Sequence, residues 1–461
     1  MGLRSHASTQ TDGLPVPRRY WAIAAIVLAI SMSVLDSSIA NVALPTIARE
    51  FHESAATSIW VINAYQIAIL VSLLPLSALG EIVGYRRISQ AGLAVFTAAS
   101  IACALAPSMV ALVGARIVQG FGAAGIMSVN AALVRFTYPQ RLLGRAVGLN
   151  AFAVATSAAI GPTIAAGILA VAPWRWLFAV NGPIGVVTLA IASVALPATE
   201  RSTRPFNWAS AALHAGTFGL IASGLQSLAH DAATGLAVAQ ICCGCLLALI
   251  LARHELEREA PLIPFDLLRI RLFSLSILTS VCSFMGQATA LVALPFEIQR
   301  LGHTAVQTGL FMTPWSLGIA LTAPIAGRLS DRLSAGLLGG AGLATMSCGL
   351  VLLALLPQGA SGPELIWRMA LCGIGFGLFQ SPNNRTLILS APRARAGAAG
   401  GMLSTARLLG QTIGAAGVAI VFRAYPGRGS NVALVIASAI ALLAALVSTL
   451  RLNARPVMAE P

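Results

Sequence analysis

Long uninterrupted runs of apolar residues constrain this chain more than any other feature of its sequence. About fourteen runs occur, at approximately residues 20–45, 57–80, 88–106, 109–134, 147–171, 176–197, 207–229, 235–252, 272–296, 305–326, 335–356, 364–382, 399–422 and 431–450. Most have roughly the 20 residues that an α-helix needs to cross the hydrocarbon core of a bilayer. The pattern therefore predicts a protein that crosses a membrane many times.

The composition supports this prediction. The 461 residues are 57% hydrophobic and only 10% charged, against about 25% charged residues in an ordinary soluble domain. So little charge argues against a soluble enzyme, a disordered chain and a nucleic-acid-binding protein. A β-barrel is excluded because its strands would alternate apolar and polar residues, and these runs do not. We therefore expect an all-α membrane protein with no nucleic-acid partner. We also expect it to be a monomer in contact with membrane lipids.

The distribution of arginine predicts the orientation of the chain. All 29 basic residues are arginines, and with the N-terminus in the cytoplasm the inner segments hold 21 of them and the outer segments five. This bias follows the positive-inside rule and predicts that both termini are cytoplasmic. The polar N-terminal stretch ends in Arg18 and Arg19 and lacks a convincing cleavage site, so we expect the first run to be a retained span.

The sequence gives no indication of a bound cofactor or metal. All seven cysteines lie inside apolar runs, without the Cys/His spacing of a zinc site or an extracellular disulfide pattern. A nucleotide-binding loop of the Walker type is also missing from the sequence. We therefore expect the cysteines to pack as small apolar residues, and we expect no enzymatic activity.

Two segments with similar sequences predict two related halves. Charged inner turns follow the second and the tenth run, in SALGEIVGYRR with Glu81, Gly84, Arg86 and Arg87, and in GRLSDRLS with Gly327, Asp331 and Arg332. The fourth and twelfth runs each carry an arginine followed by glycines, at Arg116 and Arg368. We expect six-helix halves at 1–197 and 254–461, joined by two additional spans within 198–253. Such repeats form a substrate pocket near the midplane that rocking exposes to each side in turn.

The charged turns have two interpretations. Their residues could bridge the ends of neighbouring helices and latch one state of the transporter, or they could merely obey the positive-inside bias. That bias accounts for the arginines of these turns but not for the carboxylates of Glu81 and Asp331.

Asp36 is the strongest candidate for chemistry. It lies in the first run, within LDSSIANVALP, where a carboxylate costs roughly 2.5 to 3.5 kcal/mol on insertion scales. Acids that persist in membrane spans commonly serve proton relays, so we expect Asp36 to carry protons. The alternative is a structural carboxylate held permanently by an arginine.

Arg116, in the fourth run, is the expected partner of Asp36. Both residues lie a similar number of residues from the outer ends of their helices, so at about 1.5 Å per residue they reach similar depth. Coupling of this pair to transport and a purely structural ion pair remain equally open. Gly120, Gly122 and Gly125 follow Arg116 without a preceding strand, which favours close helix packing over a phosphate loop.

The fifth run carries small residues around a proline, with Gly148, Ser157, Gly161 and Pro162. Proline removes a backbone hydrogen bond and bends a helix, while small residues let a neighbouring helix approach and slide. The segment is therefore either a hinge that also seals against proton leak or an ordinary packing surface.

Three further polar residues are weaker candidates. Asn41 follows Asp36 by about one turn and could line the same cavity. Glu297 and His303 lie at the outer margin of the ninth run, where either could exchange protons with water. Exposed charges at such margins usually have no specific role.

The ordered set of motifs resembles the fourteen-helix drug:proton antiporters of the major facilitator superfamily. The motifs, spread over residues 20–450, are LDSSIANVALP, SALGEIVGYRR, RIVQGFGAAG, GPTIAAG, WRWLFAVNGPIG, PLIPFDLLRIRLF and GRLSDRLS. The resemblance implies that Asp36 is the family's first-helix acid and Arg116 its proton-linked arginine. It likewise implies that Gly161 and Pro162 belong to the antiporter motif and Arg86 to the gating turn. The first turn departs from the family at Ser77, Glu81 and Ile82, and the fifth helix at Ala165 and Ala166.

The resemblance implies a proton-coupled exporter of hydrophobic, often cationic, toxic compounds in a bacterial inner membrane. Small amphiphilic substrates and protons are then its partners. Asp36, and at the margin Glu297, are the acids in or at the spans, so monovalent or neutral amphiphiles are favoured over dications. The alternatives are an exporter of one endogenous metabolite and a membrane sensor that keeps the fold without transport.

Overall fold

The described part of the chain is helical throughout. The structure is a computed structural model that describes residues 13–139, 142–199, 205–227, 234–256, 265–330, 332–357, 360–391 and 396–453. Its elements are α1 (Arg18–Glu50), α2 (Ala55–Ser58), α3 (Trp60–Val83), α4 (Tyr85–Ala104), α5 (Met109–Thr137), α6 (Leu143–Val171), α7 (Trp176–Ala179), α8 (Asn181–Ala195), α9 (Trp208–Ser227), α10 (Thr234–Leu256), α11 (Phe265–Leu268), α12 (Arg271–Arg300), α13 (Ala305–Leu329), α14 (Ala335–Ala354), α15 (Gly362–Leu389), α16 (Ala396–Ala424), α17 (Gly429–Leu450) and the 3-10 helix η3 (Arg451–Asn453). The expected all-α class is confirmed.

The helices agree only partly with the expected spans. Within the described residues, eleven are long and apolar enough to cross a membrane, and α6 makes a twelfth if its two bent parts form one span. The expected fourteen spans are not confirmed, because α9 and α15 are not among these helices. Both carry polar residues along their length, such as His214 in α9 and Arg368 and Asn383 in α15, which lower their apolar character.

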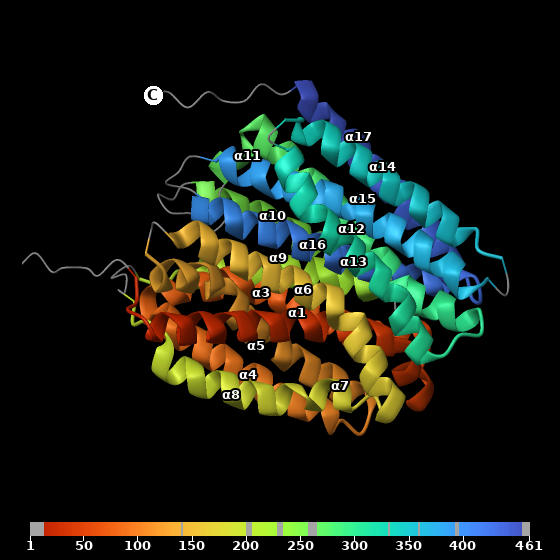
Figure 1. Ribbon diagram of the computed structural model, residues 1–461, viewed down its shortest axis with the longest axis horizontal. Coiled ribbons are helices and arrows are strands. Elements are labelled where there is room, and N and C mark those ends of the chain that lie inside the picture. The colour runs from red at the N-terminus through yellow and green to blue at the C-terminus, as the bar shows by residue number, and fades with distance from the viewer. Residues whose placement is uncertain are drawn as a thin grey trace, which may run out of the picture.

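The helices form two groups that lie side by side. In Figure 1, α1 and α3–α8 lie in the lower part of the view and α12–α17 in the upper part. Contacts between the groups run from α6 to α13, from α3 to α16 and from α1 to α12. Helices α9 and α10 pack on each other, and α9 also contacts α3 and α16.

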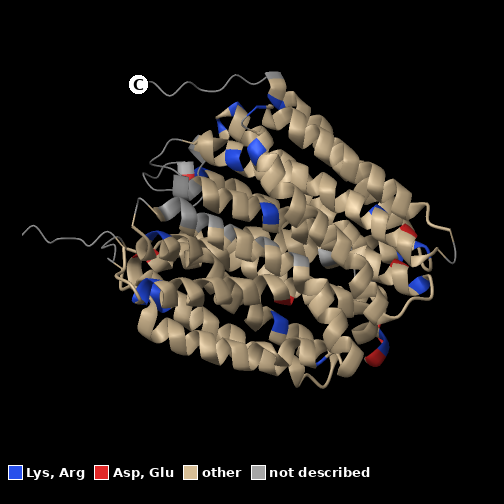
Figure 2. Ribbon diagram, viewed as in Figure 1, with Lys and Arg blue, Asp and Glu red and all other residues tan. Residues whose placement is uncertain are grey.

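The long helices run along the bundle in alternating directions, and charged residues gather towards its two ends (Figures 1 and 2). We call the end at which α1 begins, at Arg18, the proximal end, and the end at which α1 stops, at Glu50, the distal end.

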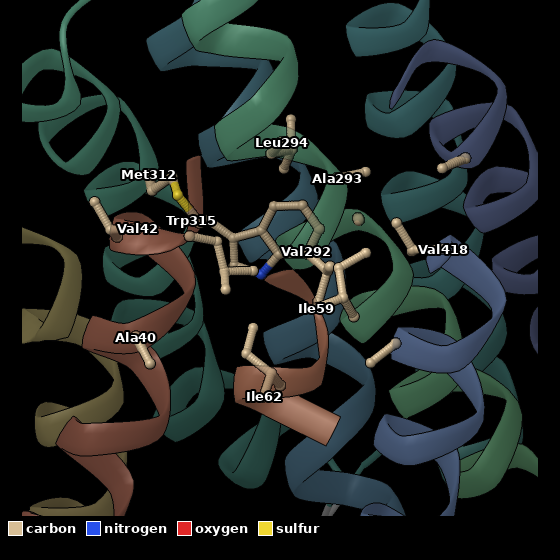
Figure 3. Close-up of a cluster of buried hydrophobic side chains, with 14 of the residues drawn as sticks. Ala40, Val42, Ile59, Ile62, Val292, Ala293, Leu294, Met312, Trp315 and Val418 are labelled. Atoms are coloured by element: carbon tan, nitrogen blue, oxygen red, sulfur yellow. The ribbon is translucent and has the colours of Figure 1, made fainter. Parts of the chain in front are cut away.

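A buried apolar cluster joins the two groups on the distal side. At its centre lies the indole of Trp315 in α13, which is 1% exposed. Figure 3 shows apolar side chains from both groups around it, among them Ala40, Val42, Ile59, Ile62, Val292, Ala293, Leu294, Met312 and Val418. Closer to the distal surface, Arg49 of α1 donates a hydrogen bond to Gln299 Oε1 of α12 at 3.0 Å. The groups are therefore packed together on this side.

Glycines set the closest approach between α4 and α5. A Cβ atom on Gly122 would lie 2.7 Å from the Cα of Phe96 and 2.8 Å from the carbonyl oxygen of Gly92. A side chain at Gly125 would similarly meet Gly92 Cα at 2.9 Å. The prediction that these glycines permit close helix packing is confirmed, because no larger residue fits at this spacing.

The cysteines only partly pack as expected. Cys103, Cys282 and Cys372 are buried, whereas Cys242, Cys243, Cys245 and Cys348 lie on exposed helix faces. A helix in a membrane protein can expose an apolar face to lipid at little cost. The position of a cysteine within an apolar run therefore does not decide whether its side chain is buried in the protein.

One arginine of the proximal end is buried in the second group. Arg451 is 4% exposed and donates to Asn383 Oδ1 at 2.6 Å and Ser276 Oγ at 3.3 Å, with a further bond to Ser448. Burial, which disfavours the charged guanidinium, lowers the pKa of Arg451 to about 10. The residue therefore ties η3 to α12, α15 and α17, a role that its place in the arginine count did not indicate.

Candidate functional site

The carboxylate of Asp36 lies inside the first group of helices with a hydrogen-bond donor on each oxygen. It is 2% exposed on α1. Arg116 of α5 donates to its Oδ2 in an ion pair, while Gln119 Nε2 and Asn181 Nδ2 donate to its Oδ1 at 2.8 and 2.9 Å. Because these donors come from α5 and α8, the site exists only once three helices have packed.

Arg116 is enclosed by the same helices. It is 0% exposed, and its Nε donates to the carbonyl oxygen of Val61 at 2.9 Å. Its guanidinium carbon lies 4.1 Å from the ring centroid of Tyr65 and 5.5 Å from that of Phe178. The structure thus brings the two residues together, as their similar depth allowed, while their role in proton coupling stays a prediction.

Two members of this network were missed in the sequence. Gln119 follows Arg116 by three residues and therefore shares its helix face, a signal that the sequence did offer. It accepts from Arg116 at 2.6 Å and donates to Ser100 Oγ at 2.8 Å. Asn181 gave no such signal, because it begins α8, 145 positions after Asp36 in the chain.

A cavity of about 530 Å³ lies between the two groups of helices. Its described lining is mostly neutral and polar or aromatic: Ser33, Ser37, Ser38, Asn41, Tyr65, Gln66, Phe284, Gln287, Trp315, Ser316, Phe376, Gln380, Ser381, Asn384 and Gln411, with apolar residues between them. Arg407 of α16 is the single charged residue in that described lining, which contains no Asp or Glu. The cavity is therefore amphipathic with one positive charge.

Three buried polar atoms of this lining have no hydrogen-bond partner in the described chain. They are Asn41 Oδ1 of α1, Gln66 Oε1 of α3 and Trp315 Nε1 of α13. Buried polar atoms are normally paired, and an unpaired one costs about 1 to 3 kcal/mol. The three side chains belong to the lining from both groups of helices, while the unpaired atoms themselves are enclosed by the protein. The structure places Asn41 in the cavity lining, and its role there stays a prediction.

Tyr65 separates the cavity from the ion pair. It lines the cavity, yet it is only 1% exposed, and its ring covers the guanidinium of Arg116. The hydroxyl of Tyr65 donates to the carbonyl oxygen of Ser33 at 3.2 Å, which fixes the ring against α1. Tyr65 therefore contacts both the cavity and the guanidinium of Arg116.

Around Pro162, α6 packs closely on α1. Two straight parts of the helix, Phe152–Ala158 and Ile160–Val171, meet at 42°. Pro162 has no N–H to give to the carbonyl of Ala158 four residues earlier, and the hydroxyl of Ser38 lies 3.5 Å from that oxygen. A side chain at Gly161 would meet Ser38 Cβ at 2.6 Å, so glycine permits this approach.

The same stretch of α6 also contacts α13 in the other group. Thr163 and Thr313 share a hydrogen bond of 2.7 Å between their hydroxyls. A Cβ atom at Gly309 would lie 2.6 Å from the carbonyl oxygen of Pro162. The predicted hinge therefore lies between the two groups, with Ser157 buried and Gly148 on the preceding turns of α6.

The first charged turn is bonded within its own group. Gly84 adopts a φ of +104°, which a side chain would strain, and Arg86 donates to the carbonyl oxygen of Ser193 at the end of α8. Glu81 and Arg87 are exposed. In the second turn Gly327 faces Ser381 and Arg332 is exposed, whereas Asp331 lies outside the described residues. The bonds described here for these turns stay within one group, so the latch remains a prediction.

Glu297 and His303 lie away from the cavity lining that the structure describes. Glu297 is 1% exposed, and its oxygens accept from Arg300 at 2.5 and 3.1 Å and from Ser430. The ring of His303 lies edge-on to Phe311, with centroids 5.0 Å apart. The structure therefore places Glu297 in a local ion pair at the distal end of α12 rather than at the cavity.

The chain has relatives among known membrane transporters. The family model of the Major Facilitator Superfamily matches residues 26–415. The Uncharacterized transporter YebQ of Escherichia coli K12 is 52% identical over 447 residues, which cover 96% of this chain and 98% of that protein. The Riboflavin transporter RibZ of Clostridioides difficile 630 is 30% identical, with 87% of each chain covered.

A third relative and a solved structure widen this picture. The Multidrug resistance protein Stp of Mycobacterium tuberculosis CDC 1551 is 31% identical over 86% of this chain and 75% of its own length. A bacterial homologue of the human lysosomal transporter Spinster, in an inward-facing and unoccupied conformation, superposes with a TM-score of 0.70. That match covers 97% of this chain and 100% of the other at 15% identity, so it supports the fold alone.

Proposed function

Because this chain belongs to the Major Facilitator Superfamily, we propose that it exports hydrophobic, amphiphilic small molecules in exchange for protons. The observation that carries the proposal is the buried pair of Asp36 and Arg116, one tyrosine away from a cavity between two helix groups. An intramembrane acid beside such a cavity can couple proton movement to the movement of a substrate. The relationship to the multidrug resistance protein Stp supports this direction of transport.

The proposal includes the expected organisation of the chain. Its six-helix halves are residues 1–197 and 254–461, and residues 198–253 add two spans. Fourteen spans result if α9 and α15 also cross the bilayer. Their support is that α9 packs against α3, α10 and α16, and that α15 packs between α13 and α14. Some polar residues of α15 contact neighbouring helices instead of lipid. Asn383, for example, donates a hydrogen bond to Ser280 of α12.

The orientation in a bacterial inner membrane is also part of the proposal. The arginine bias of the sequence supports a cytoplasmic location for the proximal end and both termini. The distal side, which the Trp315 cluster closes, then faces the outside, and the cavity is reached from the cytoplasm. In this inward-open state the carboxylate of Asp36 accepts hydrogen bonds from Arg116, Gln119 and Asn181. The substrate enters the cavity from the cytoplasm before Asp36 takes up a proton.

Rocking of the halves completes the cycle. The distal cluster opens, substrate leaves, and movement of Tyr65 gives Asp36 access to protons from outside. When the protein returns to the first state, Asp36 releases its proton on the cytoplasmic side. Its carboxylate then accepts hydrogen bonds from Arg116, Gln119 and Asn181 again. The bend of α6 at Pro162 supports a hinge role in this motion, because it lies where the groups meet.

Export of one endogenous metabolite is the second candidate. RibZ, whose name assigns it riboflavin, is about as similar in sequence as the multidrug resistance protein Stp. Aromatic rings and amide side chains in one cavity lining also suit a planar heteroaromatic compound. A membrane sensor with the same fold would show no flux at all, so transport assays separate the three.

The proposal is tested with everted membrane vesicles that carry the protein, are energised by respiration and are supplied with a panel of amphiphilic dyes in the medium. Wild type should accumulate a dye, and collapse of the pH gradient should stop it. Asp36→Asn, nearly isosteric, should abolish gradient-driven accumulation while the protein inserts normally. Glu50→Gln is the matched control, because Glu50 pairs with Arg175 at the distal surface. Undiminished accumulation by Asp36→Asn would remove this acid from the mechanism.

A further inference from the structure

We propose that the cavity selects substrates that carry an anionic group, such as a carboxylate, sulfonate or phosphate, and that Arg407 binds this group. The inference rests on the proposed function and narrows its substrate class. It differs from the sequence-based expectation of cationic compounds. The inference comes from the charge of the cavity, which no single sequence motif indicates.

Arg407 is an uncompensated cation in the cavity wall. Its guanidinium makes neither a hydrogen bond nor an ion pair with the residues that the structure describes, and the described lining holds no acid. A charge in a site with apolar walls is costly unless it is paired. A bound anion pairs it and, because a guanidinium fork matches a carboxylate or phosphate, does so with two hydrogen bonds.

The nearby acids are already engaged. Asp36 lies behind Tyr65 and accepts from Arg116, Gln119 and Asn181. Neutralised by Arg116, it adds no net negative charge for a cation in the cavity. Glu297 of α12 pairs with Arg300 and Ser430 and is not part of the described lining. The local balance of Asp36, Arg116 and Arg407 is one positive charge.

The other residues of the lining indicate which chemical groups the rest of the substrate carries. Phe284, Trp315 and Phe376 offer aromatic faces, which favour a flat apolar body. The amide side chains of Asn41, Gln66 and Gln411 also belong to the lining, and amides can donate to and accept from neutral polar groups of a substrate. The predicted ligand is therefore an aromatic organic anion with a few neutral polar groups.

The charge of the substrate changes the energetics of transport. In a one-for-one exchange, the export of a monovalent anion and the entry of a proton each make the inside of the cell more positive by one charge. A monovalent cation exchanged for one proton moves no net charge. Export of an anion is therefore driven by the membrane potential as well as by the pH gradient.

The experiment compares dyes of opposite charge on one scaffold, the anion fluorescein and the cationic ester rhodamine 6G. Fluorescence polarisation with the purified full chain in detergent measures binding, and everted vesicles measure transport. Wild type should bind and transport fluorescein in preference to rhodamine 6G. Arg407→Gln should weaken fluorescein binding about tenfold or more, the loss of one charge-assisted contact. Arg407→Lys should restore part of it, and Arg428→Gln, at an exposed distal position, should leave it unchanged.

The outcomes separate this inference from the proposed function. Fluorescein binding that depends on Arg407 but is not followed by proton-driven transport would contradict export and keep the anion site. Three results would overturn the anion site: preference for rhodamine 6G, absence of fluorescein binding, and equal fluorescein binding by wild type and Arg407→Gln. Fluorescein transport that slows when valinomycin and potassium collapse the membrane potential at constant pH gradient would support it further.

Discussion

At the scale of single residues, the chemistry depends on which side chains surround Asp36 and what they exclude. Hydrogen bonds join four polar side chains, Asp36, Arg116, Gln119 and Asn181, and each oxygen of the acid has a donor. A lone buried carboxylate would be strongly disfavoured in hydrocarbon, and this network is what makes it tolerable. The donors therefore allow the acid to stay inside the helix group.

Gln119→Leu tests this role of the donors. The change removes the hydrogen bond from Gln119 Nε2 to Asp36 Oδ1 but leaves Arg116 in place. A buried carboxylate oxygen then has one donor fewer, which costs about 1 to 3 kcal/mol. We expect the midpoint of thermal unfolding in detergent and the initial rate of gradient-driven dye uptake by everted vesicles both to fall.

Gln90→Leu is the control, because Gln90 donates to the carbonyl oxygen of Ala192 at the proximal end, away from the acid. A Gln119→Leu variant with the unfolding midpoint and the transport rate of wild type would show that this hydrogen bond contributes to neither.

At the scale of the helix, α6 shows how a few residues set a contact between elements. Pro162 frees the carbonyl of Ala158, Gly161 admits Ser38, and Thr163 reaches Thr313 in α13. Three successive residues therefore connect α6 to α1 on one side and to α13 on the other. This geometry explains why small residues and a proline occur together in this run.

Gly161→Ala should destabilise the protein because the added Cβ meets the Ser38 side chain at 2.6 Å. Overpacking of this kind costs roughly 1 to 3 kcal/mol, so the midpoint of thermal unfolding in detergent should fall. Gly167→Ala on the same helix is the control, since a Cβ there meets nothing within 4 Å.

A double variant sharpens the result. Ser38→Gly removes the side-chain atoms that the new methyl group would contact, so it should recover most of the stability lost by Gly161→Ala. If the two effects simply add, the loss arises elsewhere and the close approach of α1 and α6 is not its cause.

At the scale of the whole molecule, the two groups of helices are held together on the distal side mainly by apolar contacts. Trp315 and its neighbours from both groups form that contact (Figure 3), while the cavity lies beside them. Apolar contacts are non-directional, so such an interface can separate and close again without breaking specific charge pairs. This suits a transporter whose halves rock.

A disulfide across the distal side should therefore stop transport. Thr163 and Thr313 have hydroxyls 2.7 Å apart, so cysteines at both positions are close enough to be joined. Oxidation of the double variant in a chain freed of its native cysteines should abolish dye efflux, and reduction should restore it. Each single cysteine variant, treated in the same way, is the control. Full efflux by a completely cross-linked protein would show that the halves need not separate there.

Several properties were determined by the sequence alone. The apolar runs predicted an all-α membrane fold because a bilayer leaves the backbone no other partner. Asp36, the glycines after Arg116 and the bend around Pro162 were found because each breaks or modifies an apolar helix in a way that has a local physical cost.

Tertiary structure alone decided which side chains meet. A helix that is apolar on all sides does not reveal which face is buried, because lipid accepts apolar residues as readily as a protein interior does. Asn181 therefore gave no sign that it would reach Asp36, nor Tyr65 that it would cover Arg116. Arg407 likewise looked like one more arginine until packing placed it in a cavity whose described lining has no acid. The rotation and packing of helices, which depend on contacts between distant parts of the chain, determined the charge of that cavity.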